Sequence, residues 1–129
     1  MDTIIQSLNY IHDNTVLRYW VDFEKHTLYM DTQTEGGEMV SIQFIGLLAH
    51  HFETVIQYNI LLGIDEITID GFFNRYKELL DNSLPYGFPA FCSIEELREQ
   101  MSQDKIRIFV IDSSLGLCGF VLAQEVEIQ

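Results

Sequence analysis

Two adjacent histidines and a nearby glutamate, His50, His51 and Glu53, have the types and spacing that come closest to a metal or acid–base site. A zinc site needs three or four converging ligands. Adjacent side chains on a strand point to opposite faces, so only His51 and Glu53 would share one; in a short helical turn His50 and Glu53 would be neighbours instead. No Asp or Cys motif nearby completes a ligand set. We therefore interpret the group as structural, at a strand-to-loop transition, with one histidine satisfying buried backbone groups.

The other candidates for chemistry are a His–Asp pair and two cysteines. His12 beside Asp13 could form a general base, but that chemistry also needs a nucleophile and an oxyanion site. No G-x-S-x-G motif is present, and we interpret His12 as a residue near the C-terminal end of a helix. Cys92 and Cys118 have no basic neighbour that would lower a thiol pKa. With no P-loop, G-x-G-x-x-G or EF-hand pattern, the sequence predicts no catalytic, cofactor-binding or metal-binding residue and indicates a non-enzyme.

The length and composition bound the class of protein. The 129 residues fit one domain, 1–129, and 47% of them are hydrophobic, which is enough for a core without disulfides or metals. The opening residues, MDTIIQSLNY, lack the basic region of a secretory signal, and no stretch approaches the roughly 18 apolar residues of a membrane span. We therefore expect a cytoplasmic protein that does not enter a membrane, with both cysteines reduced and free.

The charge is strongly unbalanced. Seven Lys and Arg against twenty Asp and Glu give a net charge of −13, whereas a magnitude of about 2–8 is enough to keep a small domain soluble. This charge argues against direct binding of nucleic acid, which needs basic patches. It favours a basic partner, whose approach the field would accelerate. Simple solubility is the alternative interpretation.

The hydrophobic pattern predicts an α+β fold with a mostly antiparallel sheet. Apolar residues at helical spacing predict a helix over residues 2–14. Alternating apolar and polar residues predict strands over 15–24, 26–34 and 38–46. Short turns join these strands, so we expect an antiparallel three-strand meander.

The middle of the chain combines strand and helix signals. Residues 55–69 are apolar and β-branched, which favours a strand, with a break near Gly63. Thr68 or Asp70 would then cap a helix over residues 71–82, where the apolar residues form one stripe.

The C-terminal part predicts a helix and a hairpin. Ser93 and Glu96 have the spacing of a capping box, so a helix should begin there. Residues 105–112 are apolar on both faces and predict a central strand, 113–116 a turn, and 117–129 the last strand. The expected fold is thus the meander, this hairpin and two or three helices.

Period two places Trp20 and Tyr29 on the outward face of the first two strands. Large aromatic residues beside carboxylates are typical of a surface that binds a basic protein. In the alternative arrangement a helix covers this face and Trp20 is part of the core. The charged residues expected on the same face are Arg18, Asp22, Glu24 and Asp31.

Three segments carry a resemblance to a known family: IHDNTVLRYWVDFEKHTLYMDT (11–32), VSIQFIGLLAHHFE (40–53) and NILLGIDEITI (59–69), the last before a predicted helix. Together they resemble small bacterial α+β proteins encoded beside polymorphic toxins. In particular, they are similar to contact-dependent growth inhibition immunity proteins. The resemblance covers about the first two-thirds of the chain.

The resemblance implies a binding module. An immunity protein acts in the cytoplasm and occludes the active site of its cognate toxin, and many of these toxins are basic nucleases. It implies no catalytic residue and no cofactor, and leaves the oligomeric state open. Our candidate toxin-binding residues are the aromatic anchors and exposed acids, Trp20, Tyr29, Asp65, Glu66, Asp70, Glu95, Glu96 and Glu99.

Two other functions remain open. An acidic nucleic-acid mimic would need regularly spaced exposed carboxylates, whereas here they are scattered along the chain. A small hydrolase or metal-binding protein would have to use His12, His50 or His51.

Overall fold

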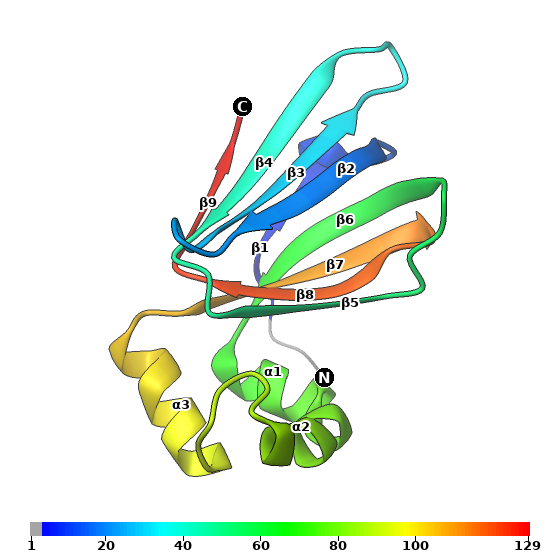
Figure 1. The fold of residues 1–129 in the computed structure, drawn as a ribbon. Coiled ribbons are helices and arrows are strands. Elements are labelled where there is room, and N and C mark those ends of the chain that lie inside the picture. The colour runs from blue at the N-terminus through cyan, green and yellow to red at the C-terminus, as the bar shows by residue number, and fades with distance from the viewer. Residues whose placement is uncertain (1–3) are drawn as a thin grey trace.

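One antiparallel sheet extends through the structure, and α-helices pack together beside one part of it (Figure 1). The computed structural model describes residues 4–129, and this α+β architecture, with three α-helices in those residues, confirms the predicted fold class. The strands are β1 (Ile4–Leu8), β2 (Thr15–Asp22), β3 (Thr27–Gln33), β4 (Met39–Ile45), β5 (Ala49–Glu53), β6 (Asn59–Ile67), β7 (Arg107–Leu115), β8 (Cys118–Ala123) and β9 (Glu125–Ile128). The helices are α1 (Ile69–Arg75), α2 (Lys77–Ser83) and α3 (Ile94–Gln103), with 3₁₀ helices at Asn9–Ile11 and Leu84–Tyr86.

The helix predicted over residues 2–14 is wrong. Its first two residues lie outside the described part of the chain, and the rest begins with β1 and a 3₁₀ helix. β1 pairs antiparallel with β6, where the Ser7 hydroxyl donates to the Asp65 carboxylate. Ile4 and Ile5 are more than half exposed, at 55% and 59%, so they do not form the apolar stripe that their spacing suggests.

β2, β3 and β4 form the predicted antiparallel meander. The inward side chains of β3 and β4 follow the predicted alternation, and those with no exposed surface are Leu28, Met30, Thr32, Ile42 and Phe44. A register irregularity between Val16 and Arg18 leaves Leu17 as an extra residue in β2. This bulge places Val16 in the core although it precedes the outward Arg18 by only two residues.

The sheet curls into a barrel because two strands are bent rather than ended. β4 continues through Gly46 into β5 and β8 continues through Gln124 into β9, and these bent strands pair with each other. At the bend the Gln124 N–H donates to the Ile45 carbonyl (2.9 Å), and a Cβ on Gly46 (φ 70°) would collide with the Gln124 side chain. The prediction of one uninterrupted strand over 117–129 is therefore wrong.

β6 and β7, with nine residues each, are the longest strands in residues 4–129, and they pair antiparallel. β6 begins at Asn59, so the first part of the strand predicted over 55–69 is a loop. The strand continues through Gly63 without the predicted break, and only its register with β7 is irregular near that residue. β7 extends through most of the turn predicted over 113–116, because Leu115 still pairs with β6.

The helix predicted over residues 71–82 is divided into α1 and α2 at Tyr76 (φ −109°, ψ 23°), whose ring contacts Phe120 at 4.6 Å. Thr68 is the residue that caps α1, and its Oγ1 accepts from the Gly71 N–H (3.0 Å). The predicted capping box of α3 is confirmed. None of the helices in residues 4–129 is long and apolar enough to cross a membrane.

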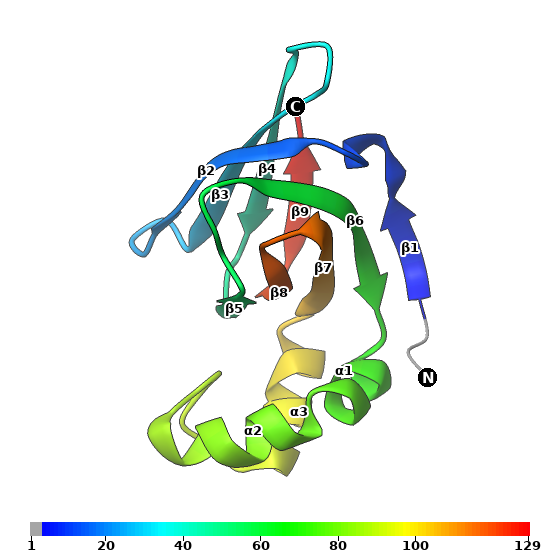
Figure 2. The same ribbon diagram turned by 90° about the vertical axis from the view of Figure 1, so that its right-hand side faces the viewer.

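The β7–β8 hairpin has a core on each of its faces. Inside the barrel its side chains meet those of β3, β4 and β6. On the outer face it is covered by the three helices, which lie below the barrel in both views (Figures 1 and 2). The outer core consists of Ile67, Phe72, Phe73, Leu80, Leu97, Met101, Ile106, Ile108, Val110, Phe120 and Leu122.

Candidate binding surface

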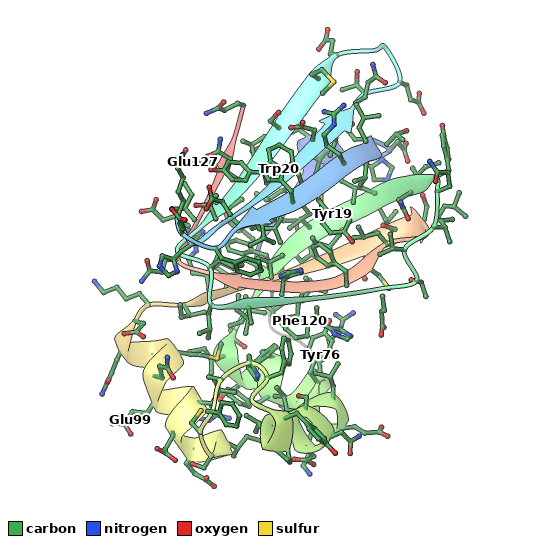
Figure 3. All side chains as sticks on the ribbon, viewed as in Figure 1. Tyr19, Trp20, Tyr76, Glu99, Phe120 and Glu127 are labelled. Carbon is green, nitrogen blue, oxygen red and sulfur yellow. The ribbon has the colours of Figure 1, made fainter. Side chains whose placement is uncertain are left out.

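None of the α-helices in residues 4–129 lies over the outward side of β2, β3, β4 and β9 (Figure 1). We call this side the uncovered face and define it by the outward residues Arg18, Trp20, Asp22, Tyr29, Asp31, Ser41, Gln43 and Glu127. Strand pairing places Trp20, Tyr29, Gln43 and Glu127 in one row across the four strands. Figure 3 labels Trp20 and Glu127 over this half of the sheet.

Trp20 and Tyr29 are directly opposite each other in the β2–β3 ladder. Their rings are stacked, with centroids 4.9 Å apart and planes 11° from parallel. Trp20 is 44% exposed, so the alternative in which a helix buries it in the core is wrong. The stack gives the uncovered face a rigid aromatic surface. Trp and Tyr side chains are among those that contribute most of the binding energy in protein interfaces.

The charges on the uncovered face are partly compensated. Arg18 and Asp31 form an ion pair (2.6 Å), and Asp31 also accepts from the Ser41 hydroxyl (2.8 Å). Asp22 accepts backbone N–H bonds from the turn that follows β2. On β9, Glu127 is exposed, and so is Glu125 beside the bend. The face is therefore aromatic at one side and acidic at the other.

The prediction that Glu66 is an exposed acid is wrong. Glu66 is 6% exposed, and both of its carboxylate oxygens accept from the Arg107 guanidinium (3.1 and 2.8 Å). This contact is the main reason why the pKa of Arg107 is raised. Gln6 of β1 also donates to Glu66 (2.9 Å), so this carboxylate joins β1, β6 and β7 and is not available to a partner.

The two acids near Glu66 in sequence lie at the end of the sheet and the start of the helices. Asp65 is half-buried and accepts from Ser7. Asp70, exposed in the first turn of α1, forms an ion pair with Arg98 of α3 (2.5 Å). Arg98 also lies over the Phe73 ring of α1, with its Cζ 4.6 Å from the ring centroid. Arg98 therefore joins α1 to α3 and partly neutralises the Asp70 carboxylate.

The three predicted acids of α3 are all exposed. Glu96 accepts from the Ser93 N–H in the capping box, and Glu99 accepts from Gln103. Figure 3 shows Glu99 on the helical layer, well away from Trp20 on the barrel. The structure therefore brings the two predicted anchors together but does not bring Glu95, Glu96 and Glu99 to them.

The histidine pair lies on a strand, β5, and not where a strand passes into a loop. His51 and Glu53 share a face, as strand geometry predicts, and His51 Nε2 is 3.3 Å from Glu53 Oε2. His50 is on the other face, beside the Phe52 ring. Burial, and secondly the neighbouring His51, lowers the pKa of His50, which favours a neutral imidazole.

A hollow of about 660 Å³ lies between β5 and α2, lined among others by His51, Glu53, Tyr76, Leu79 and Phe88. Its walls are mainly apolar, with the His–Glu pair at one side. Within residues 4–129 no group of three or more His, Cys, Asp or Glu is placed to hold a metal ion. The hydroxyl of Ser83, which also lines the hollow, donates to the Phe88 carbonyl (3.0 Å).

The remaining candidates for chemistry are dispersed. His12 Nδ1 lies 3.1 Å from Asp13, but both belong to the turn after the 3₁₀ helix and not to the end of an α-helix. Cys92 and Cys118 are free thiols, as predicted. Burial and the nearby Glu96 raise the pKa of Cys92, which lowers its reactivity.

One feature of this region has no signal in the sequence. β2 pairs with β3 over its whole length, but on its other edge it pairs with β6 only at Thr15 and Val16. How much of a strand is paired depends on where a segment distant in sequence turns away from it, and the alternation of residues does not encode this.

No protein-family model matches the chain, and no curated protein or solved structure shows significant similarity to it.

Proposed function

We propose that this protein binds a basic toxin domain, with a nuclease as the favoured class, and neutralises it by occluding its active site. The observation that carries the proposal is the combination of a net charge of −13 with an exposed Trp20, stacked on a half-buried Tyr29, on a face that no α-helix of residues 4–129 covers. The resemblance to contact-dependent growth inhibition immunity proteins supports the same function.

Charge and aromatic surface would contribute differently to such a complex. Exposed carboxylates such as Glu99, Glu125 and Glu127 accelerate the approach of a cationic partner, and salt weakens that effect. Aromatic residues that lose their water in the interface determine how slowly the complex dissociates. Trp20 and Tyr29 are our anchors, whereas the buried Glu66 is no longer a candidate.

A nucleic-acid mimic is less well supported. Such a protein would present a regular line of free carboxylates, but Asp31, Glu66 and Asp70 each form an ion pair with an arginine. The candidate acids are also divided between the sheet and the helices, because Asp65 belongs to β6 whereas Glu95, Glu96 and Glu99 belong to α3.

The test begins with the neighbouring gene, which should encode a large secreted protein with a toxic C-terminal domain. That domain is expressed in a sensitive cell, with and without this protein. We expect growth to be restored only when the protein is present, and the two purified proteins to form a stable complex. Continued killing despite abundant, folded protein would refute the proposal, and an unrelated acidic protein of similar charge serves as the control.

A further inference from the structure

The second edge of β2 is largely without a partner in the described structure. After Val16, none of the residues Leu17–Asp22 pairs with a strand on the side away from β3. In an antiparallel strand, backbone N–H and C=O groups point alternately to the two edges. Every second residue of this stretch therefore directs its N–H and C=O groups to the side that has no partner strand, and we call Leu17–Asp22 the unpaired edge.

The segment that could have continued the pairing is held away from β2. Residues 55–58 form a loop that closes on Asn59: the Ile56 N–H donates to Asn59 Oδ1 (3.1 Å), and Asn59 Nδ2 donates to the Ile56 carbonyl (2.8 Å). Asn59 is 6% exposed and also accepts from the Leu117 N–H (2.9 Å). The loop is thus tied to the β7–β8 turn, and the opening beside β2 is a built feature of the fold.

The opening is a hollow of about 300 Å³, lined among others by Leu17, Tyr19, Val55 and Ile56. These four residues are 37–49% exposed and offer apolar contacts to an incoming chain, beside the polar Arg18, Gln57 and Asn59 that also line the hollow. Tyr19, which Figure 3 shows below β2, makes an edge-to-face contact with Phe52 of β5 (5.1 Å). Side chains therefore close the barrel interior where backbone pairing stops, and an added strand would not have to displace the core.

The neighbouring aromatic pair indicates which side chain would face the edge. Tyr29 covers the side of the Trp20 ring that faces β3, so the other side faces the unpaired edge. A residue directly opposite Trp20 on an added strand would have its Cβ about 4.5–5.5 Å from the Cβ of Trp20. Its side chain would then lie against the free side of the Trp20 ring. In a protein of charge −13, a cation is favoured there, because Lys or Arg over an indole gains both cation–π and long-range attraction.

We propose that the unpaired edge of β2 binds an extended segment of a basic partner as an added antiparallel strand, with an Arg or Lys opposite Trp20. This occupant fits the chemistry at each point: backbone groups for the edge, β-branched or apolar side chains for the apolar residues of the hollow, and a cation for the Trp20 ring. A second copy of this chain is disfavoured because it would bring another charge of −13. The identity of the partner as a toxin rests on the proposed function, but the edge does not.

The first test uses a blocked peptide of alternating threonine and valine with one central arginine, added up to millimolar concentration to the isotope-labelled protein. We expect backbone amide resonances of Leu17–Asp22 to shift, and alternate amides in this stretch to exchange with solvent at least tenfold more slowly. Glutamate in place of the central arginine should weaken binding by about tenfold. Shifts located elsewhere, or none in the millimolar range, would overturn the proposal.

Two variants distinguish specific binding at the unpaired edge from non-specific binding of the peptide. Trp20→Ala should weaken the arginine peptide about tenfold but leave the glutamate peptide unchanged. Phe91→Ala removes an aromatic ring that is 86% exposed on the segment before α3 and should change neither. The amide spectrum of each variant shows directly whether it is folded. A dimer of the free protein with protected Leu17–Asp22 amides would instead identify a second copy as the occupant and overturn the proposal.

The second test repeats the exchange measurement with the toxin domain in place of the peptide. Protection of alternate amides in Leu17–Asp22 would assign the cognate partner to the edge. A tight complex that leaves these amides unprotected would overturn the inference while the proposed function stands. Peptide binding at the edge with no toxin binding would refute the proposed function and leave the inference intact.

Discussion

Two antiparallel strand pairs of the same sheet differ in their outer faces, one of which is covered by helices while the other is exposed to solvent. On β7 and β8 the outward residues include Ile108, Val110, Phe120 and Leu122, each at most 1% exposed because three helices cover them. On β2 and β3 the outward residues include Arg18, Trp20, Tyr29 and Asp31, and no helix covers them. The backbone geometry is alike, so the side chains decide which face is covered.

The difference separates the residues that stabilise the fold from those that, in the proposed function, are available to a partner. Leaving the β7–β8 face open would expose a contiguous apolar surface, which is costly in water. The uncovered face has the Arg18–Asp31 ion pair and hydrogen bonds that remain satisfied in water, with the stacked Trp20 and Tyr29 rings among them. Trp20 is 44% exposed and contributes little to the core, and in the proposed function it is an anchor for the partner.

The largest effect should come from the covered face. Phe120→Ala removes a ring that contacts Phe72, Tyr76 and Phe88, and should lower the free energy of unfolding by about 3–5 kcal/mol. Phe91→Ala makes the same chemical change at a side chain that is 86% exposed, and should change it by less than about 0.5 kcal/mol. Denaturant unfolding measures both, and similar losses would contradict the assignment of the core.

The next largest effect is expected at Glu66, which is buried and therefore no longer a candidate for partner binding. Glu66→Ala leaves the Arg107 guanidinium without its carboxylate, and should destabilise the fold by about 2 kcal/mol, less than for a fully buried pair because Arg107 is 34% exposed. At a temperature where the variant is folded, its affinity for the partner should be unchanged. A specific loss of affinity in a fully stable variant would return Glu66 to the binding surface.

A smaller effect is expected from an exposed acid of the helical layer. Glu99→Gln removes a negative charge far from Trp20, so it should slow association by at most about tenfold and leave dissociation unchanged. The difference from the unaltered protein should disappear at high salt, because the attraction is screened. Stopped-flow measurements at several ionic strengths check this, and a change mainly in the dissociation rate would place α3 inside the interface.

The smallest effect is a pH dependence at β5. Because burial lowers the pKa of His50 in the folded state, the unfolded chain binds that proton more tightly. The contribution of His50 to stability is therefore present above its usual pKa of 6.5 and decreases as the pH falls below it, towards the lowered folded-state value. Thermal unfolding between pH 7 and pH 5 should show a shallower decline for His50→Gln. An equal slope in both proteins would contradict this.

The parts of the fold that the sequence predicts are those in which local pattern and final structure agree. The alternation in β3 and β4 identifies their buried faces, and Ser93 with Glu96 identifies the start of α3. The outward position of Trp20 and Tyr29 also follows from alternation, although their stacking depends on the register of two strands. These features depend on neighbours in sequence or on one short hairpin.

The remaining features depend on distant partners. Ile4 and Ile5 have helical spacing, but the free edge of β6 takes this segment as β1. The closure of the barrel depends on a bend at Gln124 that meets Gly46, which is remote in sequence. Glu66 resembles any other surface acid until β7 places Arg107 beside it. Such contacts join segments that are distant in sequence, so the residues near either segment do not predict them.

The central claim is that the uncovered face serves a partner and the covered face serves the fold. The most direct test measures the dissociation constant of the toxin complex and the free energy of unfolding for Trp20→Ala. We predict a loss of roughly 2 kcal/mol or more in binding, about thirtyfold, with a change of about 1 kcal/mol or less in stability. Unchanged affinity in a folded variant would contradict the claim, as would a loss of stability that accounts for the whole effect.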